Sequence, residues 1–141
     1  DGGAPDAGSD ECPCVGERIR FEVFEATGML DYSRWFGSCR QYSSESLDPP
    51  SNCMGTLSCE AARSLALQLA DPQVQAALSE GGDFGSTLEG GSRLTVGDRR
   101  VNVGEPCGLN PDCTPVPAGL QLLVNDLRFG SGLSFEERMC F

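Results

Sequence analysis

Polar and apolar residues alternate where the globular part of the chain begins. Residues 18–23 read RIRFEV, so that Ile19, Phe21 and Val23 occupy every second position. A period of two is typical of a strand that buries one of its faces. A turn is expected at 26–28, where the sequence reads ATG. We therefore predict a strand with three inward-facing apolar side chains, followed by a tight turn.

A second apolar and aromatic stretch begins at Leu30, and a return strand is predicted near 39–42. The aromatic residues of this region are Tyr32, Trp35, Phe36 and Tyr42. Two interpretations of them are open. Trp and Tyr dominate binding interfaces, which favours a binding face, whereas a small domain more often buries its only tryptophan. The next segment, 46–52 (SLDPPSN), is a loop by composition.

Three later segments have the helical period of 3.6 residues. The first begins at a cap that is either Thr56 or Ser58. The second begins at Asp71, with Pro72 at the first helical position, and the third opens at Pro117. Their apolar residues are, in chain order, Ala61, Leu65 and Leu69, then Val74, Ala77 and Leu78, then Leu120, Leu123, Val124 and Leu127.

A hairpin is predicted between the second and third helices. Residues 92–104 (SRLTVGDRRVNVG) alternate apolar and polar positions on both sides of a central GD pair. Near the C-terminus, Ser134 and Glu137 have the spacing of a capping box, which predicts one last helical turn. The fold class is therefore α+β: a small antiparallel β-sheet packed on one face by two or three helices and reinforced by disulfides.

The first eleven residues differ in composition from the rest. Residues 1–11 (DGGAPDAGSDE) hold Gly, Ala, Pro, Ser and acids, with nothing to bury, so a disordered acidic tail is expected. An equally open interpretation is a lipoprotein-type tether, with a lipid anchor upstream of Asp1. Residues 12–141 are expected to form a single disulfide-bonded α+β domain. No stretch is long and apolar enough for direct membrane insertion as a helix.

Eight cysteines accompany a complete absence of histidine and lysine. An even, dense set of cysteines indicates disulfides and an oxidising compartment, here extracellular or the cell envelope of a bacterium. The alternatives are reduced thiols or a metal cluster, but the gaps of one and five residues do not match zinc-ligand spacing. Cys12-Pro13-Cys14 has a second interpretation as a redox or copper-binding pair. We expect no metal and no cofactor.

Sequence alone does not choose among the pairings of eight cysteines. Closure of short loops favours Cys53–Cys59 and Cys107–Cys113. The others are expected to fasten the N-terminal strand and the C-terminus to the body; they are Cys12, Cys14, Cys39 and Cys140.

The net charge of −11 and the missing residue types exclude several functions. All ten cations are arginines, scattered along the sequence apart from the adjacent Arg99 and Arg100, so neither nucleic acid nor another polyanion is an expected partner. Catalytic triads and phosphate loops need histidine or lysine, so the protein is not expected to be an enzyme. Paired carboxylates remain available to a hydrolase; the candidates are Glu136 with Glu137, and Asp98, Glu105 and Asp112. The simpler interpretation of these acids is a solvated face and turns.

The order of elements resembles that of emfourin-type proteins, small bacterial inhibitors of thermolysin-like metallopeptidases. The matching stretches are the strand 19–25, the turn 27–30, the segment 55–58 with the helix 61–69, the hairpin 94–103, and VPAGL at 116–120. The resemblance implies that Thr27, Gly28, Met29 and Leu30 form a protruding loop that blocks a peptidase cleft.

The sequence therefore predicts a secreted or lipid-anchored, non-enzymatic domain that binds a protein, with inhibition of an extracellular peptidase as the narrower hypothesis. The candidate partner-binding residues are Thr27, Gly28, Met29, Leu30, Tyr32 and Trp35. One alternative is a structural or accessory domain of a bacterial envelope lipoprotein. A second alternative is a carboxylate-based hydrolase.

Overall fold

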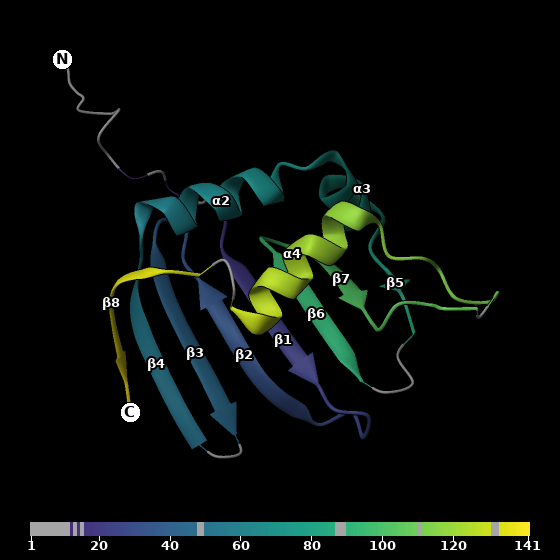
Figure 1. Ribbon diagram of the computed structural model, residues 1–141, viewed down its shortest axis with the longest axis horizontal. Coiled ribbons are helices and arrows are strands. Elements are labelled where there is room, and N and C mark those ends of the chain that lie inside the picture. The colour runs from purple at the N-terminus through teal and green to yellow at the C-terminus, as the bar shows by residue number, and fades with distance from the viewer. Residues whose placement is uncertain are drawn as a thin grey trace.

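The computed structural model describes residues 12, 14, 16–47, 50–86, 90–109, 111–130 and 133–141. These described residues form an eight-stranded sheet and three helices (Figure 1). The strands are β1 (Ile19–Phe24), β2 (Leu30–Phe36), β3 (Gln41–Leu47), β4 (Pro50–Leu57), β5 (Asp83–Phe84), β6 (Gly91–Val96), β7 (Arg99–Val103) and β8 (Phe135–Cys140). The helices are α2 (Cys59–Leu69), α3 (Pro72–Glu80) and α4 (Ala118–Phe129). The α+β class is confirmed, whereas the tail expected at 1–11 lies outside the described residues.

The sheet is larger than expected and is mixed. Its strand order is β5-β7-β6-β1-β2-β3-β4-β8. Every neighbouring pair is antiparallel except β5 and β7, which run parallel over two residues. The predicted antiparallel arrangement therefore holds everywhere but at this short edge strand.

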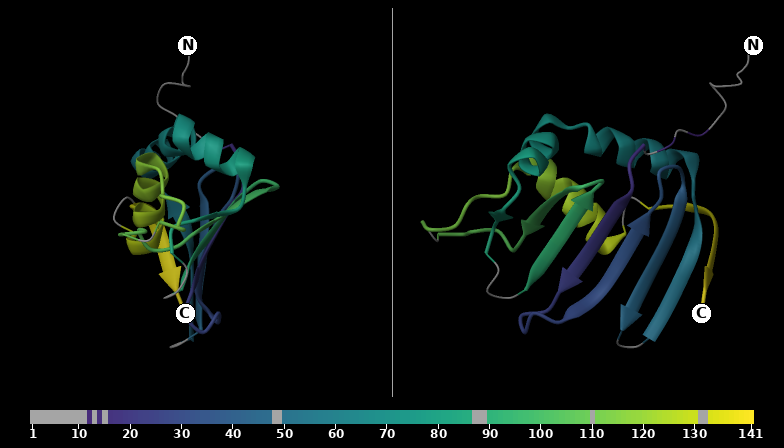
Figure 2. Two further views of the ribbon diagram at one scale, coloured as in Figure 1. Left: turned by 90° about the vertical axis from the view of Figure 1, so that its right-hand side faces the viewer. Right: turned by 180° about the vertical axis from the view of Figure 1, so that it is seen from behind.

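One face of the sheet carries the hydrophobic core. In Figure 1 the helix α4 crosses in front of the central strands, and from behind the strands lie uncovered (Figure 2). The predicted inward residues Ile19, Phe21 and Val23 are buried on the covered face. All ten apolar residues predicted on the three helices are buried as well, so the helical periodicity located the core correctly.

The helix ends follow the chemistry of the sequence. Of the two proposed caps for α2, Ser58 is the one used, because its hydroxyl accepts a hydrogen bond from the Ala61 backbone N–H at 3.1 Å. Asp71 caps α3 by accepting from the Gln73 N–H at 2.8 Å. Gly130 ends α4 in the left-handed region at φ 71°, a conformation that suits glycine.

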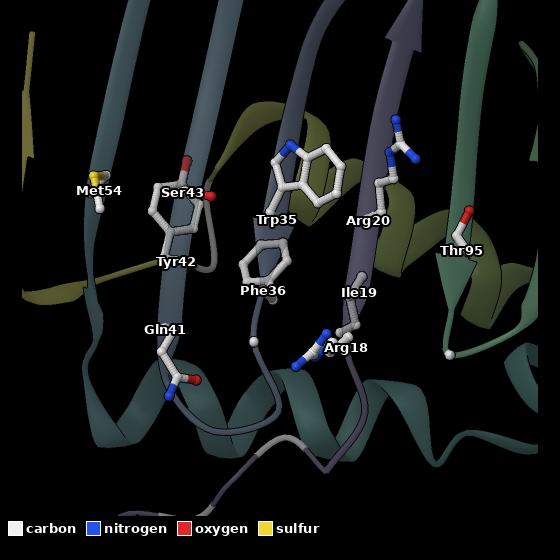
Figure 3. Close-up of a pocket in the computed structure, with 12 residues that line it drawn as sticks. Arg18, Ile19, Arg20, Trp35, Phe36, Gln41, Tyr42, Ser43, Met54 and Thr95 are labelled. Carbon is white, nitrogen blue, oxygen red and sulfur yellow. The ribbon is translucent and has the colours of Figure 1, made fainter.

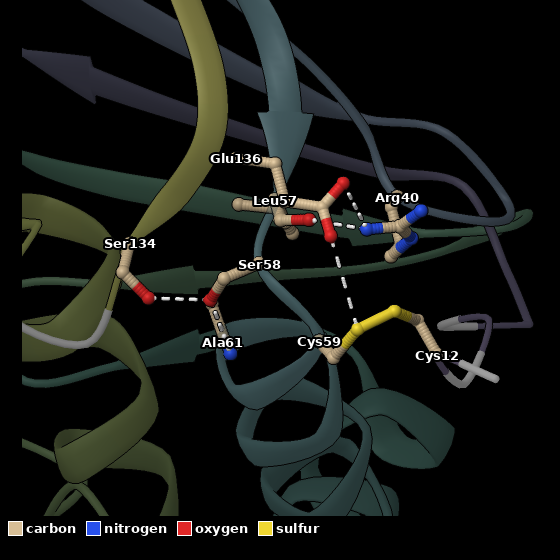
Figure 4. The surroundings of a disulfide bond; sticks show 8 residues. All are labelled: Cys12, Arg40, Leu57, Ser58, Cys59, Ala61, Ser134 and Glu136. Carbon is tan, nitrogen blue, oxygen red and sulfur yellow. Dashed lines mark hydrogen bonds and ion pairs between the residues drawn. A yellow bond between two sulfur atoms is a disulfide. The ribbon is translucent and has the colours of Figure 1, made fainter. Parts of the chain in front are cut away.

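Two expectations about local structure are wrong. The described part of the segment 46–52 is strand and not loop, because β3 runs to Leu47 and β4 starts at Pro50; residues 48 and 49 lie outside the described residues. A proline at the first residue of a strand loses no ladder hydrogen bond. The last helical turn is also wrong, since 135–140 forms β8 along β4. Ser134 contacts the Ser58 hydroxyl instead of capping a helix (Figure 4).

Four disulfides are present: Cys12–Cys59, Cys14–Cys39, Cys53–Cys140 and Cys107–Cys113. The short Cys107–Cys113 loop is as the spacing predicts, but the expected Cys53–Cys59 bond is wrong. The chain between these two cysteines is mostly extended in β4, which holds them too far apart for a disulfide. Cys53 instead meets Cys140 directly across the β4–β8 pair.

Candidate functional site

The turn between β1 and β2, residues 25–29, is closed by backbone hydrogen bonds. The Glu25 N–H donates to the Met29 carbonyl and the Gly28 N–H donates to the Glu25 carbonyl, both at 2.8 Å. Gly28 has φ 90°, which a side chain at this position would disfavour. Thr27 and Gly28 are exposed, and the Met29 side chain is 65% exposed. The turn therefore presents one large apolar side chain on a defined backbone; we call residues 25–29 the β1–β2 tip.

The six candidate partner-binding residues do not share one surface. Thr27, Gly28 and Met29 lie in the tip, and Leu30 begins β2. Side chains alternate along a strand, so Tyr32 and Trp35 point to opposite faces of the sheet. Tyr32 faces the helices, and Trp35 faces away from them. The aromatic run thus divides into a core part and an exposed part.

Tyr32 fastens the sheet to the end of α4. Its hydroxyl donates to the Arg128 carbonyl at 2.7 Å, and the Arg34 guanidinium donates to the same carbonyl at 3.3 Å. Burial raises the pKa of the Tyr32 hydroxyl above its ordinary value, although the charges of Arg34 and Arg128 oppose the rise. These contacts give Tyr32 a structural role.

Because the folded state holds the Tyr32 proton more tightly than the unfolded state, its contribution to stability is complete below pH about 10 and is lost as the pH rises above that value. We expect Tyr32→Phe to cost about 1 kcal/mol at neutral pH and to weaken the alkaline decline. Urea unfolding of both proteins between neutral and alkaline pH checks this. Parallel declines in the two proteins would contradict it.

The face of the sheet opposite the helices, which we call the open face, carries a continuous cross-strand row. Residues paired directly opposite one another point to the same side. The row runs, from β7 to β8, through Arg100, Thr95, Arg20, Trp35, Ser43, Met54 and Met139. Trp35 is 40% exposed at its centre. The core interpretation of the only tryptophan is therefore not what the structure shows.

Two adjoining hollows follow this row. One, of about 550 Å³, includes Trp35, Ser43 and Met54, and the other, of about 590 Å³, includes Arg93 and Arg100. Arg20 and Thr95 line both hollows. We call the combined depression the trough; its first hollow is drawn in Figure 3.

Four of the ten arginines line this trough although they are dispersed along the sequence; they are Arg18, Arg20, Arg93 and Arg100. Antiparallel pairing of β1, β6 and β7 brings three of them together. Glu22 is 6% exposed between two of them, with oxygens 3.4 Å from the Arg20 guanidinium and 3.9 Å from that of Arg93. The positive charge at the middle of the trough is thereby partly compensated.

The candidate carboxylates do not converge. Glu136 and Glu137 are neighbours on a strand and so point to opposite faces, and Glu136 pairs with Arg40 at 2.8 Å. Asp98 lines the trough, whereas Glu105 pairs with Arg128 of α4 at 3.1 Å, on the helix side. Among the described residues, Asp98, Glu105 and the Glu136–Glu137 pair thus offer no shared pocket of the kind that a glycosidase uses.

One group of metal-ligating residue types lies within the described chain. Cys12, Cys59 and Glu136 have ligand atoms within 4.8 Å of one another (Figure 4). Both sulfurs are joined in a disulfide, so neither is a thiolate, the form that binds metal. Cys12 and Cys14 form disulfides with different partners. They are therefore two structural cysteines and not a redox or copper-binding pair.

Fold and surface together define a disulfide-reinforced α+β domain with one face of its sheet uncovered. The chain matches no protein-family model, no curated protein and no solved structure. Among the described residues, no helix combines the length and the apolar character needed to cross a membrane. The four disulfides are compatible with an extracellular location.

Proposed function

We propose that this protein is a non-enzymatic domain of the bacterial cell exterior that binds another protein through the β1–β2 tip. The observation that carries the proposal is the exposure of Met29 at the end of a closed turn. An unbranched thioether side chain adapts well to an apolar pocket in a partner. The two central strands on either side of the tip give it a firm base.

The conformation of the tip suits it for binding. Two backbone hydrogen bonds close the turn, and the Met29 N–H lies 3.4 Å from the Thr27 hydroxyl oxygen. A segment that is already ordered loses little conformational entropy when it binds. Figure 2 shows this turn at the end of the sheet that is remote from α2, where a partner can reach it.

The narrower proposal is inhibition of a thermolysin-like metallopeptidase by insertion of the tip into its cleft. The resemblance in element order to emfourin-type proteins supports it. Four disulfides also support it, because an inhibitor must resist cleavage, and cross-links reduce the opening that a peptidase needs.

The tip is tested by Met29→Asp, with Leu67→Asp as matched control. Leu67 on α2 is 68% exposed, so both changes place a charge on a similarly exposed apolar position. We expect Met29→Asp to weaken inhibition at least 30-fold, since loss of an interface anchor costs about 2 kcal/mol or more, and Leu67→Asp to leave it unchanged. Inhibition constants against a panel of secreted metallopeptidases are the measurement.

An equal loss of inhibition in both variants would mean that the tip is not part of the interface with the peptidase. Absence of inhibition by the wild-type protein across the panel would overturn the inhibitor proposal. Binding to a peptidase without inhibition would leave a protein-binding domain of the accessory kind.

A further inference from the structure

The open face carries a flat aromatic surface that the proposed function does not use. Figure 3, which looks onto this face, shows the broad side of the Trp35 ring system turned toward the viewer. The indole N–H donates to the Ser33 hydroxyl at 3.1 Å, and the Arg20 guanidinium lies 4.3 Å from the ring centre. The ring is therefore held in place before any ligand arrives.

Hydrogen-bonding side chains line the same hollow as this ring. Ser43 is next to Trp35 in the cross-strand row and Thr95 is next but one, beyond Arg20. Their hydroxyls both donate and accept. The side-chain amide oxygen of Gln41 already accepts from the Cys39 N–H at 3.1 Å, which leaves the side-chain NH₂ group as a donor. Arg18 adds further donors at the same hollow. An aromatic plane with donors and acceptors along the same hollow matches a sugar chain, whose rings have apolar C–H faces and a rim of hydroxyls.

The charge of the trough is mixed, and that of the whole protein is strongly negative. Four arginines and two acids line the trough, and one of the acids, Glu22, contacts both Arg20 and Arg93. The whole protein carries a net charge of −11, so a long polyanion would be repelled as it approached. The trough arginines can still donate hydrogen bonds to hydroxyl oxygens.

A peptide fits this surface less well than a sugar chain. Extended peptides usually add to the edge of a sheet, where backbone N–H and C=O groups are free. The centre of the trough lies over β1, β2, β3 and β6, each of which has strands paired on both sides, and its ends reach Met54 on β4 and Arg100 on β7. The backbone groups of the four central strands are used in the ladders, so only their side chains are available for recognition.

We propose that the trough binds a neutral polysaccharide chain, with one sugar ring stacked on the Trp35 indole and hydroxyls along the chain bonded by Ser43, Thr95 and Arg18. The indole face carries negative electrostatic potential that attracts the polarised C–H bonds of the ring. This site lies on the sheet face and not at the β1–β2 tip. It is independent of the proposed function.

The test uses the disulfide-intact protein and a panel of neutral oligosaccharides: cello-, xylo-, manno- and chito-hexaoses. Trp35 is the only tryptophan, so a sugar that stacks on it shifts the fluorescence of the wild-type protein directly. We expect saturable shifts with at least one sugar, and a loss of affinity of at least tenfold in Trp35→Ala by calorimetry. Trp35→Phe, which keeps an aromatic plane, should retain part of the affinity. Phe129→Ala, at a 72% exposed aromatic residue on α4, should leave it unchanged.

Several results would overturn the site. One is the absence of both heat and fluorescence change with every neutral sugar at millimolar concentration. Another is binding confined to acidic oligosaccharides and abolished by salt, which would indicate a polyanion site. A third is binding of an acidic or aromatic peptide in place of sugars. Sugar binding that persists in Trp35→Ala without a fluorescence response in the wild type would place the site elsewhere. None of these results depends on peptidase inhibition.

Discussion

Replacing both Cys53 and Cys140 by serine is expected to lower the free energy of unfolding by about 4–5 kcal/mol. This disulfide joins residues 87 positions apart, and the entropy that a cross-link removes from the unfolded chain grows with the length of the loop it closes. The bond also holds β8 to β4. All residues of β8 but the first are exposed, so little burial would keep the strand in place without it.

The matched control is the double serine variant of Cys107 and Cys113. That bond spans a separation of only six residues, and its removal should cost about 2 kcal/mol. Guanidinium unfolding of the oxidised proteins gives both values, and hydrogen exchange of the β8 amides shows whether the strand detaches first. A cost for the Cys53–Cys140 bond no greater than for the short loop would contradict the prediction.

The Cys53–Cys140 bond could not be predicted from the spacing of the cysteines. Loop closure correctly favoured Cys107–Cys113, because the residues between are turn formers with no strand to extend them. Loop closure predicts the wrong disulfide partner for Cys53, because the actual bond depends on β8 lying beside β4. The capping-box spacing of Ser134 and Glu137 instead predicts a helix for the segment that forms β8. In the structure, residues 135–140 form a hydrogen-bonded ladder with β4, and this tertiary pairing outweighs the local preference for a helix.

The alternation of side chains along a strand also predicts which aromatic residues share a face of the sheet. The rule that placed Ile19, Phe21 and Val23 inward also separates Tyr32 from Trp35, three positions apart, onto opposite faces. Applied to β2, it would have divided the aromatic run correctly. The pairing of β2 with β1 and β3 cannot be read from any single strand, so the period-two pattern alone does not predict that Arg20 and Ser43 lie beside Trp35.

The gathering of arginines could not be read from the chain order. Arg20 and Arg100 are eighty positions apart in the numbering, and they come within two places of each other in the cross-strand row only because β6 lies between β1 and β7. The expectation that the cations are scattered is therefore correct for the sequence and wrong for the surface. The net charge was a better guide, since it still argues against a polyanionic ligand.

Replacing Phe21 by alanine is expected to cost about 3–5 kcal/mol. Phe21 is fully buried on β1, at the middle of the sheet, and belongs to the same core as Leu94 and Leu123. Removing its ring loses the transfer free energy of the side chain and leaves a cavity that the strands on both sides prevent from collapsing. Thermal and urea unfolding measure the loss.

Phe24→Ala on the same strand is the matched control, because its side chain points to the open face. Phe24 is only partly buried, with the Arg93 guanidinium 5.0 Å from its ring centre. Its removal opens no closed cavity, so the expected cost is about 1 kcal/mol. Similar costs for the two changes would mean that both faces of the sheet are covered in solution. Trp35 would then not be available to a sugar chain, and the trough on the open face would lose its physical basis.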